Sequence, residues 1–185
     1  MVETMFRWVT PNQLTLGRIG AIPLLLLLIW LERPVGNYFA VALFALACMT
    51  DYLDGVLARQ RGEITQLGKL LDPIADKMLI LSSLILLVGM GIAGTFPTIL
   101  IAMRELAVGG LRSVAAAEGV IISAAPGAKW KTGLQMGATG ALMLHHNPLA
   151  LPFDVLGQAL LWVATAWTLW TGYAYFSDYF RYSGR

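Results

Sequence analysis

The sequence predicts an all-α integral membrane protein with about six transmembrane helices and a short N-terminal interfacial helix. Of its 185 residues, 57% are hydrophobic and only 13% are charged, and the mean hydropathy is +0.67. A soluble protein of this size would lack the polar residues needed to cover its surface. Apolar runs also recur at roughly the 20-residue length that a helix needs to cross a bilayer. We find no repeat or second domain, so we expect one membrane domain over residues 1–185.

Six apolar segments are the expected spans. They cover residues 13–32, 38–60, 67–90, 95–118, 129–147 and 153–180. Clusters of Gly, Pro and Asn, which favour turns, follow several of them. The first run has no small-residue cleavage site and ends in Trp30, Glu32 and Arg33, so we interpret it as a retained span and not as a signal peptide. Residues 2–10 are expected to form the interfacial helix, with their aromatic side chains toward lipid.

The basic residues predict how these spans are oriented. With an even number of spans, both termini lie on one side of the membrane, and the opposite side receives Arg33 alone. The first side receives Arg7, Arg59, Arg61, Lys69, Lys77, Arg112, Lys129, Lys131, Arg181 and Arg185. Because cytoplasmic loops are rich in Lys and Arg, we expect both termini and the link between the second and third spans to be cytoplasmic.

Four aspartates flank the link between the second and third spans. Asp51 and Asp54 are three residues apart, and Asp72 and Asp76 are four apart, so each pair shares one helical face. A hairpin would bring the pairs together, and four carboxylates at membrane depth would repel one another strongly without cations. The ligands are all oxygen, which favours hard divalent ions. Two ions could share the four carboxylates.

The residues between the aspartates are small or able to bind phosphate. Gly55 and Ala58 leave the backbone open to a ligand, as does Gly68 at the start of the return helix. Arg59 can offer its planar guanidinium to a phosphate or a base. Thr65 supplies a hydroxyl in the connecting loop. The combination indicates a pocket for a nucleotide diphosphate held by divalent metal.

Two other interpretations of the aspartates remain open. A cation transporter or channel would use them as its permeation site. Against it, they cluster at one membrane face, and the acidic residues of the outer half are Glu32 and Asp154. A purely structural scaffold gives no reason to place Asp51 and Asp54 inside the apolar boundary, where burying each unpaired costs roughly 3 kcal/mol.

The pattern D-x2-D-G-x2-A-R-x8-G-x3-D-x3-D in this segment resembles the signature of the CDP-alcohol phosphotransferases. The matching residues are Asp51, Asp54, Gly55, Ala58, Arg59, Gly68, Asp72 and Asp76. Four further stretches are similar to one branch of that family, the bacterial phosphatidylglycerophosphate synthases. These stretches are PNQLTLGRI, MRELAVGGLR, KWKTGLQM and LTLWTGYAYF. The resemblance extends across the chain, since the family has six transmembrane helices with the motif across the second and third.

The resemblance implies a reaction and its partners. The hydroxyl of glycerol 3-phosphate would attack CDP-diacylglycerol, release CMP and form phosphatidylglycerol phosphate at a bacterial inner membrane. Membrane lipids and a second copy in a homodimer are the other implied partners. The net charge of +2 gives no indication of nucleic acid. The same chemistry with inositol phosphate, serine or phosphatidylglycerol as the acceptor stays open.

The family's residue roles carry over to the matched positions. Two Mg²⁺ or Mn²⁺ ions would be bound by Asp51, Asp54, Asp72 and Asp76, and Asp76 would also be the catalytic base that takes the acceptor's proton. CDP-diacylglycerol would be bound by Leu14, Thr15, Leu16, Gly17, Gly55, Ala58, Arg59, Thr65 and Gly68. Arg18 could also face the nucleotide, and Asn12 could do so or cap the first helix. A single displacement is expected, and the residues leave a covalent intermediate open.

Glycerol 3-phosphate carries a dianionic phosphate, so its site should be cationic and near the metals. Arg104 and Arg112 lie eight residues apart on the fourth span, roughly on one face. Lys129 and Lys131 begin the fifth span on the cytoplasmic side. The four could bind the phosphate, Arg by its paired donors and Lys as a point charge. Alternatively, Arg104 pairs with Glu105 or an aspartate, and the lysines only anchor the helix at the membrane surface.

Overall fold

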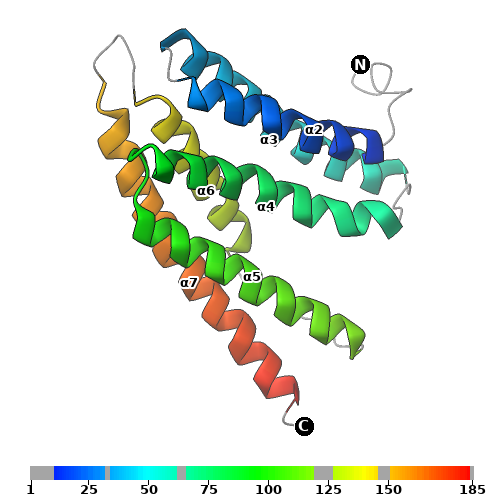
Figure 1. The fold of residues 1–185 in the computed structure, drawn as a ribbon. Helices are drawn as coiled ribbons and strands as arrows, with labels where there is room; N and C mark the ends of the chain where they lie inside the picture. The colour runs from blue at the N-terminus through cyan, green and yellow to red at the C-terminus, as the bar shows by residue number, and fades with distance from the viewer. Residues whose placement is uncertain (1–10, 32–33, 62–65, 119–126, 146–150, 184–185) are drawn as a thin grey trace. The chain divides into compact units, whose positions relative to one another are not determined.

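A computed structural model of the chain describes residues 11–31, 34–61, 66–118, 127–145 and 151–183. These residues form six α-helices and no strand, which confirms the helical part of the predicted fold class (Figure 1). The side chains at 11–14, 34–35, 51–61, 66–73, 76, 128–129 and 182–183 lie outside the description. The predicted interfacial helix at residues 2–10 also lies outside the described residues.

The helices follow the predicted apolar segments closely. They are α2 Pro11–Trp30, α3 Pro34–Arg61, α4 Gln66–Gly89, α5 Thr95–Ala117, α6 Ala128–Met143 and α7 Phe153–Ser183. The start of α3 lies before the predicted residue 38, because a proline in the first helical turn costs no hydrogen bond. The end of α6 lies before the predicted residue 147, and the backbone N–H of Leu144 donates to the Ala141 carbonyl at 3.0 Å to close the last turn.

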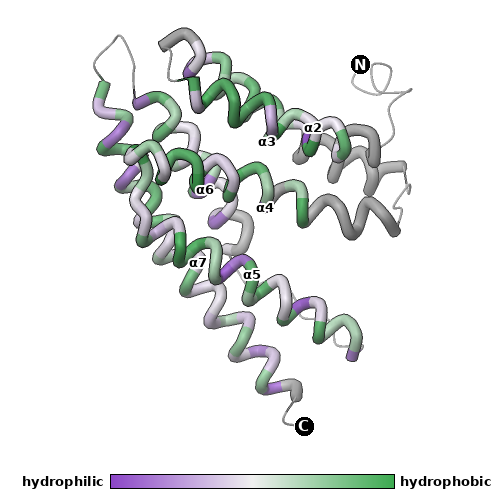
Figure 2. The backbone as a smooth tube through the Cα atoms, in the orientation of Figure 1, coloured by the Kyte–Doolittle hydropathy of each residue, from purple (hydrophilic) through white to green (hydrophobic). Residues whose placement is uncertain are grey.

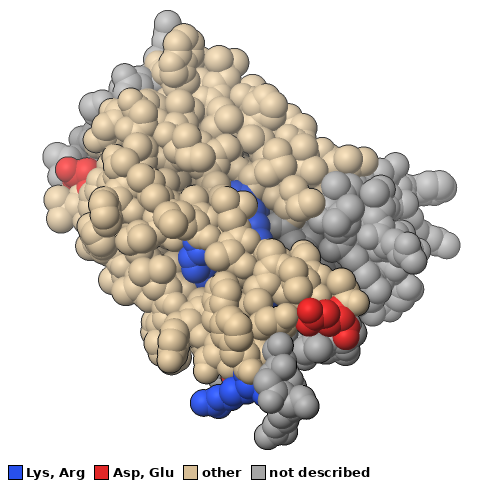
Figure 3. Space-filling view, turned by 60° about the horizontal axis from the view of Figure 1, so that its bottom comes forward, with Lys and Arg blue, Asp and Glu red and all other residues tan. Residues whose placement is uncertain are grey.

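The surface of the described residues is rich in apolar side chains. Trp30 is 65% exposed, Phe39 63% and Phe96 70%. Hydrophobic residues colour long stretches of the helices in Figure 2, and charged side chains occupy only small separate areas of the face in Figure 3. Within the described ranges, no helix combines the length and the sustained apolarity needed to cross a membrane.

The chain divides into two compact units, residues 1–86 and 87–185, and each is described by itself. In the first unit, α2 packs along α3. Each of these helices buries one apolar stripe with spacings of three and four residues, which is the period of a helical face. The stripes are Ile22, Leu25 and Ile29 in α2 and Ala40, Phe44 and Ala47 in α3. The unit also contains most of α4.

In the second unit, α7 packs against both α5 and α6. Two side-chain contacts show that α5 and α7 run parallel. Near their starts, Gln158 Nε2 donates to the carbonyl of Ile92 at 2.7 Å. Near their ends, the hydroxyl of Tyr179 donates to Glu118 Oε2 at 3.0 Å.

The pairing of α6 with α7 is antiparallel. The indole Nε1 of Trp167 donates at 3.1 Å to the carbonyl of Gly127, the residue before α6. At the other end of α6, a Cβ added to Gly157 would lie 2.7 Å from Cγ of Leu142. The middle of α7 therefore lies beside the start of α6 and the middle of α5.

Candidate functional site

Both predicted aspartate pairs lie on continuous helices of the first unit. Asp51 and Asp54 are in the C-terminal part of α3, and Asp72 and Asp76 are in the first half of α4. Spacings of three and four residues put each pair on one helical face. The side chains of all four lie outside the described ones, so their metal and base roles stay predictions. Within the described residues, no group of three or more His, Cys, Asp or Glu gathers to hold a metal.

The residues predicted to bind CDP-diacylglycerol are described only in part. The side chains of Leu14, Gly55, Ala58, Arg59, Thr65 and Gly68 lie outside the description. Thr15 is 1% exposed and Arg18 3%, so these two residues share the buried face of α2. Leu16 is 53% exposed, and no heavy atom lies within 4 Å of where a Cβ on Gly17 would be. Leu16 and Gly17 therefore lie on an open side of α2.

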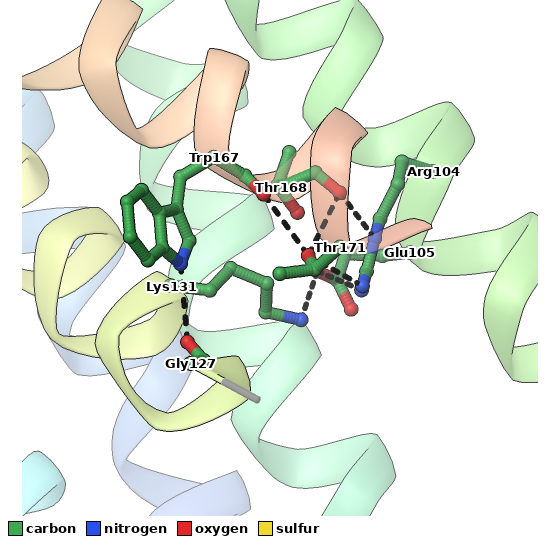
Figure 4. Close-up of polar contacts among 7 residues, drawn as sticks. All are labelled: Arg104, Glu105, Gly127, Lys131, Trp167, Thr168 and Thr171. Carbon is green, nitrogen blue, oxygen red and sulfur yellow. Dashed lines mark hydrogen bonds and ion pairs between the residues drawn. The ribbon is translucent and has the colours of Figure 1, made fainter. Parts of the chain in front are cut away.

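Arg104, in the middle of α5, is buried against α7 (Figure 4). Its Nε donates to the carbonyl of Thr168 at 2.9 Å, and its Nη2 donates to Oγ1 of Thr171 at 3.1 Å. The guanidinium also lies 5.8 Å from the centre of the Tyr175 ring. A Cβ on Gly172 would lie 3.1 Å from Cγ of Arg104, so the missing side chain leaves room for the arginine. These contacts orient the guanidinium on α7.

Glu105, the next residue of α5, connects this arginine to α6. Its Oε1 accepts hydrogen bonds from Arg104 Nη1 at 3.2 Å and from Lys131 Nζ at 2.5 Å. The side chains of Arg104, Glu105 and Lys131 are 6%, 8% and 13% exposed, so water screens these charges weakly. Two cations share one carboxylate, and the group has a formal charge of +1. The pairing of Arg104 with Glu105, one of the sequence alternatives, is thus present, while its role toward the acceptor stays a prediction.

The other two predicted acceptor residues are placed differently. Arg112 is exposed on α5, and eight residues of helix separate it from Arg104 by about 12 Å along the axis. The side chain of Lys129 lies outside the description. Of the four predicted cations, the structure brings Arg104 and Lys131 together, with Glu105 between them.

The start of α6 is held by a contact between Trp167 and Gly127. The carbonyl of Gly127 accepts the indole N–H, as Figure 4 shows. The φ angle of Gly127 is +82°, in the left-handed region, and a Cβ there would lie 3.0 Å from Cζ2 of the indole. Glycine adopts this φ angle without strain and has no side chain to clash with the indole. Because Lys131 lies one turn into α6, this contact also helps to set its position.

Sequence reasoning missed Thr168, Thr171 and Trp167 as parts of a polar group, and it named Glu105 only as an alternative partner of Arg104. A signal was present, since Thr165, Thr168 and Thr171 recur every three residues in an apolar helix, and each is 2% exposed or less. Hydroxyls on one face of such a helix indicate a polar partner on a neighbouring helix. Oγ1 of Thr168 has no hydrogen-bond partner among the described residues.

Known proteins match this chain over the aspartate pairs of the first unit and over the Arg104–Lys131 group of the second. A family model for CDP-alcohol phosphatidyltransferase matches residues 8–170, which include both aspartate pairs and the Arg104–Lys131 group. A CDP-diacylglycerol–glycerol-3-phosphate 3-phosphatidyltransferase of Rickettsia bellii is 39% identical over 93% of this chain and 96% of its own length. The Bacillus subtilis protein of that name is 39% identical over 90% and 93%. That of Cereibacter sphaeroides is 32% identical over 91% and 94%.

Proposed function

The chain belongs to the CDP-alcohol phosphatidyltransferase family, and from this we propose that it transfers the phosphatidyl group of CDP-diacylglycerol to glycerol 3-phosphate. The products are phosphatidylglycerol phosphate and CMP. The observation that carries the proposal is that relatives from three bacterial genera, each matched over nearly its full length, have the same name. The uninterrupted aspartate motif adds support, because it supplies the reactive residues.

The donor set of that motif fits divalent metal. Its four aspartates offer only carboxylate oxygens, which Mg²⁺ and Mn²⁺ prefer, and the family generally depends on divalent metal. Two ions could be held by Asp51, Asp54, Asp72 and Asp76. When bound, such ions would reduce the charge on the diphosphate and stabilise the departing CMP.

The chain's own residues supply proton transfer and nucleotide binding. The acceptor oxygen forms a bond to the lipid-bearing phosphorus while the bond from that phosphorus to CMP breaks, and CMP leaves with the electron pair. Asp76 takes the hydroxyl proton as attack proceeds. Arg59 donates to the CDP moiety, and Gly55 and Gly68 leave room for it. Ala58, Thr65 and the stretch at residues 14–17 complete the CDP-diacylglycerol site.

Four cationic residues form the proposed acceptor-phosphate site. They are Arg104, Arg112, Lys129 and Lys131. The group of Arg104, Glu105 and Lys131 supports this proposal, because it has a formal excess of one positive charge in a setting nearly closed to water. A phosphorylated acceptor gains from such a charge, and free serine gains less.

We also propose that the chain is a multi-pass protein of the bacterial cytoplasmic membrane and a homodimer. The lipid substrate, the 57% hydrophobic composition and the exposed aromatic side chains support the membrane assignment. Both termini and the active site are cytoplasmic in this arrangement. Alkaline carbonate should leave the protein in the membrane pellet. In a Cys48→Ser background, Arg185→Cys should react with an impermeant thiol reagent only after the cells are opened.

A product assay tests the activity. The purified protein receives CDP-diacylglycerol with glycerol 3-phosphate, inositol phosphate, serine or phosphatidylglycerol, and CMP and the lipid formed are identified. We expect phosphatidylglycerol phosphate from glycerol 3-phosphate, loss of activity in EDTA, and recovery with excess Mg²⁺. If product formed only with one of the other alcohols, that alcohol would be the acceptor instead of glycerol 3-phosphate. Divalent-ion flux into liposomes without CMP release would instead favour a transporter.

A further inference from the structure

One carboxylate links three helices of the second unit. Arg104 of α5 is bonded to α7 through the Thr168 carbonyl and the Thr171 hydroxyl. Glu105 accepts from Arg104 and also from Lys131 on α6, 26 residues away in the sequence. In Figure 4 these contacts form a continuous series from the backbone of α7 to the ammonium of Lys131. The position of that ammonium therefore depends on residues that do not belong to α6.

The two cations of this group differ in how they are held. Arg104 donates from Nε, Nη1 and Nη2 to groups of its own chain, and its side chain is 6% exposed. Lys131 is the more accessible of the two, at 13%. Arginine presents its donors in a rigid plane, whereas the lysine ammonium is a point charge on a flexible stem. Within the proposed acceptor-phosphate site, Arg104 is therefore the rigidly held cation, and Lys131 is the more accessible cation whose position depends on its neighbours.

A second contact restricts the backbone of the same lysine. Trp167 Nε1 donates to the Gly127 carbonyl, which fixes where α6 begins. Lys131 follows one turn later, so the indole limits where its backbone lies while Glu105 limits where its Nζ lies. A lysine stem loses about 2 kcal/mol of rotamer freedom when it is ordered. Holding it before the ligand arrives removes part of that cost from binding.

We propose that Glu105 and Trp167 are positioning residues that hold Lys131 for the phosphate of the acceptor, an inference that rests on the proposed function. Neither residue contacts the acceptor. Glu105 places a negative charge near a dianion, which opposes binding, but it keeps the Lys131 ammonium beside Arg104 and reduces the repulsion between the two cations. Removing either positioning contact should therefore weaken acceptor binding. The affinity for CDP-diacylglycerol and the rate of the chemical step should not change.

Steady-state kinetics of the full chain in detergent, with CDP-diacylglycerol and glycerol 3-phosphate, test this inference. Glu105→Gln should raise the KM for glycerol 3-phosphate about tenfold, the loss expected for one charge-assisted hydrogen bond. Glu105→Asp should recover part of it, and Trp167→Phe should raise the same KM several-fold. The kcat and the KM for CDP-diacylglycerol should stay within about twofold. Glu118→Gln and Trp162→Phe, at exposed positions of α5 and α7, are the matched controls and should match the wild type.

Double variants separate positioning from a general structural role. If Glu105 and Trp167 act through Lys131, adding Glu105→Gln or Trp167→Phe to Lys131→Met should not raise the acceptor KM further. Additive effects, or an unchanged KM in both single variants, would overturn the inference. Trp167→Phe tests it even where Glu105→Gln fails to fold. A wild-type protein that forms no phosphatidylglycerol phosphate would defeat the proposed function itself, so the two failures are distinguishable.

Discussion

The side chain of Arg104 donates to the backbone carbonyl of Thr168 at 2.9 Å, across 64 residues of sequence. This carbonyl lies in the middle of α7, one turn before Gly172. The hydroxyl of Thr171 also donates to it, at 3.0 Å. The missing side chain at Gly172 lets the arginine reach a helical carbonyl that is normally covered. The contact joins the middles of two helices and orients the neighbouring Glu105.

The first prediction concerns this contact. Arg104→Lys keeps the charge but cannot reproduce three donors in one plane, so the Thr168 carbonyl and the Thr171 hydroxyl lose the hydrogen bonds that they accept from the arginine. We expect a loss of about 2 kcal/mol of stability, seen as a lower midpoint of thermal unfolding in detergent. Arg181→Lys, near the end of α7, is the control and should leave the midpoint unchanged. An unchanged midpoint in Arg104→Lys would mean that the three bonds contribute little.

The second prediction concerns Gly172. A methyl group here would lie 3.1 Å from Cγ and 3.2 Å from Nε of Arg104, which is held by three hydrogen bonds and cannot move freely. Gly172→Ala should therefore cost about 1 kcal/mol or more, despite the better helix propensity of alanine. On the open side of α5, Gly110→Ala has no atom within 4 Å of the new methyl and should be neutral or stabilising. Thermal unfolding of both variants compares the two, and equal midpoints would contradict the prediction.

The third prediction concerns Gly127. Gly127→Ala forces an L side chain into the left-handed region and brings its methyl to 3.0 Å from the indole of Trp167. The conformational term alone costs about 1–2 kcal/mol. We expect a lower unfolding midpoint and a changed Trp fluorescence maximum, because the indole must move. Gly140→Ala, inside α6 with no heavy atom within 4 Å, should show neither change.

The fourth prediction concerns the proposed base. Asp76→Asn removes the carboxylate that accepts the acceptor's proton and also one metal ligand, so kcat should fall by roughly 10² or more. CMP release from CDP-diacylglycerol measures it. Asp154→Asn, at the exposed start of α7, should retain wild-type activity. Full turnover by Asp76→Asn would remove this residue from the mechanism.

Much of the helical framework could be predicted from the sequence, because apolar runs and turn residues are local features. Each predicted segment corresponds to a helix, and the ends differ by a few residues. The largest differences are at the start of α3 and the end of α6. Both depend on whether a terminal turn closes its hydrogen bonds, and hydropathy does not report that.

The candidate site was predictable to different degrees in its two parts. The aspartate pairs depend on spacing along single helices, so their places on α3 and α4 followed from the sequence. The surroundings of the basic residues cannot be read from spacing along one helix, because they depend on which neighbouring helix each residue meets. Arg104 and Arg112 looked equivalent on one face of a helix, yet one is buried against α7 and the other is exposed.

The sequence by itself determined the all-helical class, the positions of six helices and the membership of the family, since each depends on residue type and local spacing. Only the tertiary structure decided that Glu105 is shared by Arg104 and Lys131 and that Trp167 meets Gly127. Those contacts join residues on different helices, and their formation depends on the direction and register with which α5 and α6 pack on α7. Register arises from the interlocking of whole helix surfaces, which no short stretch of sequence contains.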